Sequence, residues 1–112
     1  MVVALPLNTF RTVAFELTTS EQTVYTTPAS LTTIVLGAQA SNISDAAATI
    51  TFTLVKNATD FIMLKEFIIP PNDAAEVTTG KLVIEEGGSV KAVVSADSSI
   101  NLVLSILETS NE

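Results

Sequence analysis

The sequence predicts an all-β protein, an antiparallel β-sandwich of jelly-roll or Greek-key type with eight to nine short strands. In residues 49–55 the apolar Ile50, Phe52 and Leu54 alternate with threonines, which is the two-residue period of a β-strand. Threonine is β-branched, so it favours a strand over a helix. Turn residues also recur about every 8–12 residues along the chain, as they do in sandwiches and barrels rather than in βαβ units.

Nine segments show strand-like patterns, and each ends where the turn chemistry changes. Pro28 ends the second strand, and Gly37 predicts a bulge or a close backbone approach within the third. The fifth segment could also be an amphipathic helix, but the Pro70-Pro71 pair that follows it favours a strand. Gly87-Gly88 predicts a hairpin that joins the seventh and eighth strands. The predicted strands are residues 11–18, 22–26, 31–40, 49–56, 61–69, 74–78, 81–85, 89–96 and 100–107.

The 112 residues are enough for one domain with its own core. Residues 10–108 are predicted to form a single β-sandwich domain, preceded by an extended N-terminal arm at 1–9 and followed by a C-terminal tail at 109–112. Pro6 prevents a helix in the arm.

The arm is rich in apolar side chains, which are a poor choice for a segment left free in water. It either packs on its own domain, stays disordered, or lies on a neighbouring subunit. In the last case the candidate partner-binding residues are Val2, Val3, Leu5 and Leu7.

The net charge of −7, with only five basic residues, gives no basic stripe with which to bind nucleic acid. The same charge disfavours an anionic membrane surface, and no apolar run approaches the length of a membrane span. The chain has no cysteine, so it can form no disulfide. We therefore expect no nucleic-acid partner and no membrane partner.

No catalytic, cofactor-binding or metal-binding residues are predicted. The chain has no His and no Cys, which removes the usual triads and zinc sites. Glu85 and Glu86 are neighbours in a predicted strand end and would point to opposite faces, so a solvated end is the simpler interpretation. Four aspartates occupy turns, where a calcium site is conceivable but no spacing requires one; they are Asp45, Asp60, Asp73 and Asp97. The chain is therefore not expected to be an enzyme.

The aromatic residues are expected to lie mostly in the core. Tyr25, the single tyrosine, is expected to be buried with its hydroxyl bonded near the turn at Pro28. A carbohydrate platform around Tyr25, Phe10 and Phe61 is the alternative. The five phenylalanines are Phe10, Phe15, Phe52, Phe61 and Phe67.

Five segments carry a resemblance to a known class of protein: YTTPA at 25–29, TIVLGAQ at 33–39, FIIPPNDA at 67–74, GKLVIE at 80–85 and LSILE at 104–108. In order and spacing they are similar to small virion structural proteins of tailed bacteriophages, from about residue 8 onward. Proteins of this kind are small β-sandwich modules that act as capsid cement or decoration proteins or as parts of the neck or tail. The resemblance implies a non-enzymatic virion component and assigns no site residues.

Three functions are compatible with these observations. The preferred one is a capsid cement or decoration protein that bridges major capsid subunits. A neck, tail or fibre component of the phage particle is the first alternative, and a carbohydrate-binding β-sandwich module is the second. The implied partners are the major capsid protein or other virion proteins, with a homodimer or homotrimer expected. The implied location is the virion, assembled in the host bacterial cytoplasm.

Overall fold

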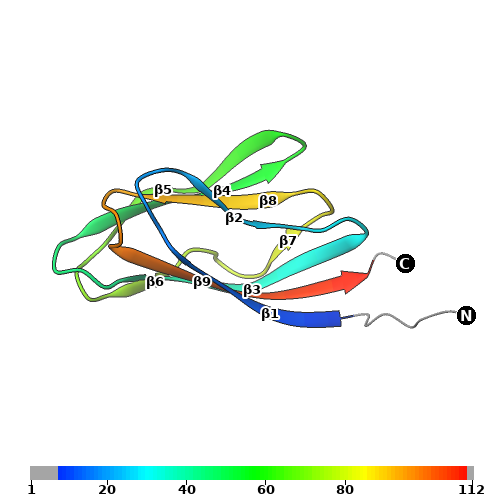
Figure 1. Cartoon of the computed structure of the whole chain (residues 1–112), viewed down its shortest axis with the longest axis horizontal. Helices are drawn as coiled ribbons and strands as arrows, with labels where there is room; N and C mark the ends of the chain where they lie inside the picture. The colour runs from blue at the N-terminus through cyan, green and yellow to red at the C-terminus, as the bar shows by residue number, and fades with distance from the viewer. Residues whose placement is uncertain (1–7, 111–112) are drawn as a thin grey trace, which may run out of the picture.

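The computed structural model describes residues 8–110, and these residues form nine β-strands and no helix (Figure 1). The strands are β1 (Asn8–Glu16), β2 (Gln22–Thr26), β3 (Leu31–Asn42), β4 (Ala48–Lys56), β5 (Thr59–Ile69), β6 (Ala74–Glu76), β7 (Leu82–Ile84), β8 (Ser89–Val94) and β9 (Ile100–Ser110). Every predicted strand is present, so the prediction of an all-β fold is confirmed.

The strands form two antiparallel sheets packed face to face. Sheet A has the order β1-β9-β3-β6, with β7 also paired to β3, and sheet B has the order β2-β8-β4-β5. Figure 1 shows the two sheets as a lower and an upper layer. The chain crosses repeatedly between them, and the first and last strands pair in sheet A. This is the strand order of a jelly roll.

The inner faces of the two sheets supply the core. In β4, Ile50 and Phe52 are completely buried, as their alternation with threonines predicts. In β9 the buried residues are likewise every second one, with Leu102, Leu104 and Ile106 each 1% exposed. The period of two therefore sets which side of each sheet is apolar.

The first and last strands extend beyond their predicted outer ends. β1 begins at Asn8 rather than at residue 11, and β9 continues to Ser110 rather than ending at 107. The two extensions pair with each other, Asn8 opposite Thr109, so their backbone groups satisfy one another. Residues 8–9 and 109–110 are consequently strand residues and not arm or tail.

The expected hairpin between the seventh and eighth strands is wrong. β7 pairs with β3 in sheet A and β8 pairs with β2 and β4 in sheet B, so the turn carries the chain from one sheet to the other. The glycines still serve a tight turn: Gly87 has a φ of 81°, and a Cβ on Gly88 would lie 2.9 Å from Ile84 Cγ2. Turn chemistry fixes the local backbone but does not specify which sheet receives the next strand.

The predicted irregularity at Gly37 is confirmed. The register between β3 and β9 shifts between Val35 and Gly37, which marks a β-bulge. Glu76 of the neighbouring β6 accepts a hydrogen bond of 2.8 Å from the Ala38 backbone N–H just beyond the bulge. The bulge therefore keeps its backbone donor satisfied at the point where the ladder is interrupted.

Candidate functional site

The outer face of sheet A carries a row of apolar side chains that crosses four strands. Direct register partners place Phe10 of β1 beside Leu107 of β9, Leu107 beside Ile34 of β3, and Ile34 beside Val83 of β7. Partners in register point to the same face of a sheet, so the four side chains lie side by side. Phe10 is 72% exposed and Val83 is 54% exposed. The row therefore presents apolar surface to solvent rather than to the core.

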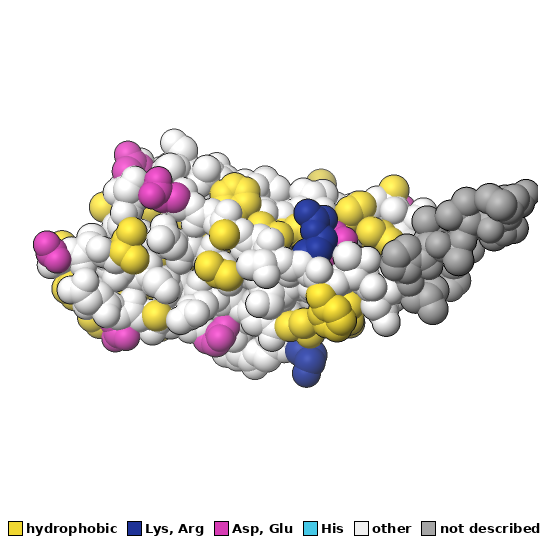
Figure 2. All heavy atoms as spheres, turned by 60° about the horizontal axis from the view of Figure 1, so that its bottom comes forward, with side chains coloured by type: hydrophobic (Ala, Val, Ile, Leu, Met, Phe, Trp, Pro, Cys, Tyr) yellow, Lys and Arg dark blue, Asp and Glu magenta, His cyan; other side chains and the backbone are white. Residues whose placement is uncertain are grey.

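Around this row the face carries few charges, and we call it the sheet A face. In β1, β9, β3 and β6 the charged residues at outward positions are Glu16, at the end of β1, and Glu76, which pairs with Gln39. Figure 2, turned toward this side, shows yellow patches and scattered blue and magenta side chains on a largely white background. Uncharged polar side chains cost less to remove from water than charged ones, and they can form hydrogen bonds with a partner, so this surface suits contact with another protein. The other outward residues are Asn8, Thr12, Ala14, Thr32, Gly37, Gln39, Ser41, Asn101, Val103, Ser105 and Thr109.

A second exposed apolar region lies on the hairpin of β4 and β5, which stands out from the body in Figure 1. Phe61 and Phe67 of β5 pair with Leu54 and Ile50 of β4, whose side chains face the core, so both phenylalanines are on the inner face. They are nevertheless 52% and 43% exposed. Opposite them, sheet A has only the three-residue strands β6 and β7. The expectation that Phe10, Phe61 and Phe67 lie in the core is therefore wrong, whereas it is confirmed for Phe52.

Two bulges in β5 alter which of its residues share a face. Met63 is an extra residue between Ile62 and Leu64, and two residues, Lys65 and Glu66, stand opposite Thr51 alone. Glu66 has a positive φ of 49°, and its N–H donates to Thr51 Oγ1 at 3.0 Å. As a result Leu64 joins Phe61 and Phe67 on the inner face, which simple alternation does not predict.

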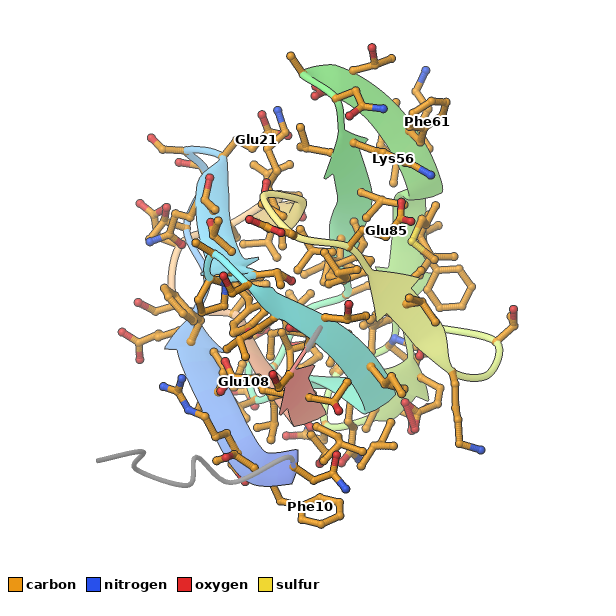
Figure 3. All side chains as sticks on the ribbon, turned by 90° about the vertical axis from the view of Figure 1, so that its right-hand side faces the viewer. Phe10, Glu21, Lys56, Phe61, Glu85 and Glu108 are labelled. Carbon is orange, nitrogen blue, oxygen red and sulfur yellow. The ribbon has the colours of Figure 1, made fainter. Side chains whose placement is uncertain are left out.

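A hollow of about 520 Å³ lies between the β4–β5 hairpin and the turn that follows β7. At its rim Lys56 Nζ lies 2.9 Å from Glu85 Oε1, an ion pair that joins sheet B to sheet A. Figure 3 shows Lys56 and Phe61 together on the hairpin with Glu85 close below them. The lining residues are 54–58 and 83–88. The hollow is large enough for side chains of a partner, since ligand pockets measure roughly 300–1,000 Å³.

A buried polar cluster holds the first and last strands together. The Tyr25 hydroxyl donates a hydrogen bond to Glu108 Oε2 and lies 2.9 Å from Thr33 Oγ1. Arg11 Nη1 donates to the same Glu108 oxygen at 3.2 Å. Thr27 Oγ1 is 3.0 Å from Thr33 Oγ1 and 3.1 Å from the Ile84 carbonyl oxygen. These contacts compensate for the loss of hydration of a carboxylate that is only 7% exposed.

The environment of this cluster changes the titration of Tyr25. Burial, together with the hydrogen bond to the Glu108 carboxylate, raises the pKa of Tyr25 from 10.0 to about 12. The expected burial of Tyr25 is confirmed, whereas its hydroxyl is bonded to Glu108 of β9 and Thr33 of β3 rather than at the turn. Its side chain is not available as a carbohydrate platform, and Phe10 and Phe61 lie at opposite corners of the molecule (Figure 3).

The outer face of sheet B, in contrast, carries charge. Lys91 Nζ of β8 lies 2.8 Å from Asp60 Oδ2 and 3.2 Å from Glu21 Oε1. The hydrogen bond to Asp60, followed by that to Glu21, raises the pKa of Lys91. Lys91 and Ile62 are the register partners of Thr53, which is only 3% exposed although it faces outward.

The predicted partner-binding residues Val2, Val3, Leu5 and Leu7 lie outside the described residues, so the structure does not place them. In the part of the chain that the structure describes, no three His, Cys, Asp or Glu side chains are close enough to hold a metal ion. Within residues 8–110 there is also no helix long and apolar enough to cross a membrane.

Sequence reasoning missed Glu108 and Arg11. Glu108 follows the last predicted strand, residues 100–107, but it continues the alternation of Leu102, Leu104 and Ile106 and so faces inward. That alternation is the signal that could have identified it, because a carboxylate at a core position requires buried donors. The donors themselves, Tyr25 and Arg11, are distant in sequence and could not be assigned from spacing.

No protein-family model matches the sequence, and no curated protein matches it. Solved structures with the same fold include a chain of the acid-stable capsid of Helicobacter pylori bacteriophage KHP30, with a TM-score of 0.55 and 9% identity over 96% of this chain and 90% of that one. A chain of the disulfide-linked pili of Bacillus endospore appendages matches with a TM-score of 0.57 and 8% identity over 100% of this chain and 99% of that one. A chain of the T13 IBDV viral particle matches with a TM-score of 0.53 and 9% identity over 92% of this chain, but only 31% of that chain is covered. Identities this low establish a shared fold and nothing further.

Proposed function

We propose that this protein is a non-enzymatic structural protein of a bacteriophage virion, and within that class a capsid cement or decoration protein that bridges major capsid subunits. The observation that carries the proposal is the sheet A face, with its apolar row and few charges on a chain whose net charge is −7. A cement protein acts through contact area, and a standard interface needs about 800 Å² from each partner and no chemistry. The fold shared with a phage capsid chain supports the same proposal.

In this proposal the sheet A face lies against the major capsid protein or another virion protein. The segment that precedes β1 contacts a neighbouring subunit through Val2, Val3, Leu5 and Leu7, and copies associate as dimers or trimers. The protein would join the particle in the cytoplasm of the host bacterium, where a chain without cysteine needs no oxidation to mature.

The test is a binding experiment with particles that lack the protein. The variants Phe10→Glu and Val103→Glu place a charge on the sheet A face, where both residues are exposed, so folding should be unaffected. Their occupancy on the particle should fall by roughly tenfold or more, because a carboxylate would be buried without a partner. Ile68→Glu is the matched control, since Ile68 is 64% exposed on the outer face of sheet B. Wild-type occupancy for both sheet A variants would overturn the proposal.

A neck, tail or fibre component is the second candidate. The similarity to a pilus chain over the full length of both proteins supports it. A disulfide-linked fibre is excluded, because this chain has no cysteine. Copy number distinguishes the candidates: a cement protein is present in many copies over the shell, whereas a neck or tail protein is present in few. Quantitative mass spectrometry and electron microscopy of the particle measure both properties.

A further inference from the structure

The inner face of β5 is an incomplete part of the sandwich. β5 has eleven residues, but the strands of sheet A on that side, β6 and β7, have three each. Leu64 is mostly covered, whereas Phe61 and Phe67, on the same face, remain about half exposed. A core-facing surface that its own molecule does not cover is available to an apolar group from elsewhere.

The hollow extends this surface into a binding site. It lies between the hairpin and the turn after β7, and its walls combine apolar residues such as Leu54 and Ile84 with Gly87 and Gly88. The charges at its rim, Lys56 and Glu85, are paired at 2.9 Å. Asn57 and Glu86 also line the hollow, so its polarity is mixed, and the apolar part of the acceptor surface is the inner face of β5.

We propose that the inner face of β5 and this hollow receive residues 2–7 of a second copy of the same chain. Four of these six residues have large apolar side chains and none is charged. In an extended segment Val3, Leu5 and Leu7 point to one side and can cover Phe61 and Phe67 together. Fully extended, six residues span roughly 20 Å, which is comparable to the stretch of β5 from Phe61 to Phe67.

We assign the segment to another copy because, within one molecule, residues 2–7 are joined to β1, which lies far from the inner face of β5. Residues 2–7 lead into β1, at one edge of sheet A, while β5 is at the edge of sheet B that lies above the opposite side of sheet A. Viewed from the end of the sandwich, Phe10 and Phe61 are at opposite corners (Figure 3). Donor and acceptor surfaces are therefore different parts of the molecule, and repetition of the contact builds a head-to-tail ring or chain.

Side-chain contacts, rather than a long β-ladder, hold the segment in this arrangement. The bulges at Met63 and at Lys65 and Glu66 interrupt the regular pattern of β5. Bulges of this kind protect an edge strand from indiscriminate pairing. Recognition therefore depends on the apolar side chains of residues 2–7, which makes the contact selective for that segment.

This inference deepens the proposed function and rests on it in one respect, the contact of the arm with a neighbouring subunit. It identifies that subunit as another copy of the chain. The experiment needs no particle, so its failure is separate from failure of the sheet A face to bind capsid.

The test combines two defective variants in sedimentation velocity. A chain with residues 2–7 deleted can accept a segment but cannot donate one, whereas the double variant Phe61→Glu, Phe67→Glu can donate but cannot accept. Each variant alone should be monomeric at concentrations where the wild type assembles. An equimolar mixture should form a heterodimer and nothing larger, because one intact contact is restored. Circular dichroism checks that each variant keeps its strands.

Ile68→Glu is the matched control, because it places the same charge on the same strand but on the outer face. It should assemble like the wild type. A wild-type chain that stays monomeric at every concentration would overturn the inference, and so would a deletion variant that assembles normally. A mixture that remains monomeric while the wild type assembles would do the same.

Discussion

The sandwich has a sealed half, built from β1 to β4, β8 and β9, and an open half, built from β5 to β7. In the sealed half, β1 pairs with β9 over nine residues without a bulge, and the Tyr25–Glu108–Arg11 cluster closes its interior. In the open half, β5 has two bulges and leaves Phe61 and Phe67 half exposed. The sealed half thus contributes chiefly to stability, and the open half retains surface for a partner.

The largest effect is expected from removing the central core aromatic. Phe52 is completely buried in β4, and Phe52→Ala should lower the free energy of unfolding by about 3–5 kcal/mol through lost burial and a cavity. Denaturant titration of the isolated chain measures this value. A loss near zero would mean that the inner face of β4 is assigned incorrectly.

In the sealed half, Tyr25→Phe should lower the free energy of unfolding by about 1–3 kcal/mol, because Glu108 loses a buried donor and keeps Arg11. Denaturant titration near neutral pH measures the loss. A neutral result would show that Arg11 alone stabilises the carboxylate.

The same cluster predicts a fall in stability at alkaline pH. The folded pKa of Tyr25, about 12, lies above its unfolded value of 10.0, so unfolded chains release the proton first. The contribution of the protonated Tyr25 to the free energy of unfolding is fully present below pH 10. It is lost between pH 10 and about 12, and the loss amounts to roughly 2–3 kcal/mol. Tyr25 is the only tyrosine and there is no tryptophan, so phenolate absorbance follows this residue alone. Tyr25→Phe is the control, in which this component of the alkaline fall should be absent.

In the open half the same type of truncation should have much less effect on folding. Phe61→Ala should cost about 1 kcal/mol, because about half of the side chain is already in solvent. Its denaturation midpoint should stay close to that of the wild type and far above that of Phe52→Ala. A loss as large as that of Phe52→Ala would show that the hairpin is part of the closed core.

The smallest effect is expected at the rim of the hollow. Lys56 and Glu85 are both largely exposed, so Lys56→Ala should change the free energy of unfolding by less than about 1 kcal/mol. Thermal unfolding at low and high salt checks this, because the small loss should shrink as salt screens the pair. A loss that does not depend on salt would point to packing by the lysine stem instead.

Most of the fold could be predicted from the sequence because local chemistry determines it. The alternation around Phe52 predicts β4 and its inner face, and Gly37 predicts the bulge in β3. What could not be predicted depends on contacts between distant segments. The turn at Gly87 and Gly88 has the same chemistry whether it joins paired strands or crosses between sheets.

The candidate surfaces were less predictable than the fold for the same reason. Phe61 and Phe67 have the pattern of core residues, and only the shortness of β6 and β7 leaves them exposed. The row from Phe10 to Val83 appears only once four strands are in register. Apolar periodicity identifies a face, but the size of the opposing sheet decides whether that face is covered.

The position of β9 between β1 and β3 has a consequence for biosynthesis. Sheet A lacks its central member until residues 100–110 have left the ribosome, so a nascent chain cannot complete the sandwich before that point. The row from Phe10 to Val83 forms only at that moment, because Leu107 of β9 is one of its four members. A polypeptide truncated before β9 therefore never displays the complete row of the sheet A face.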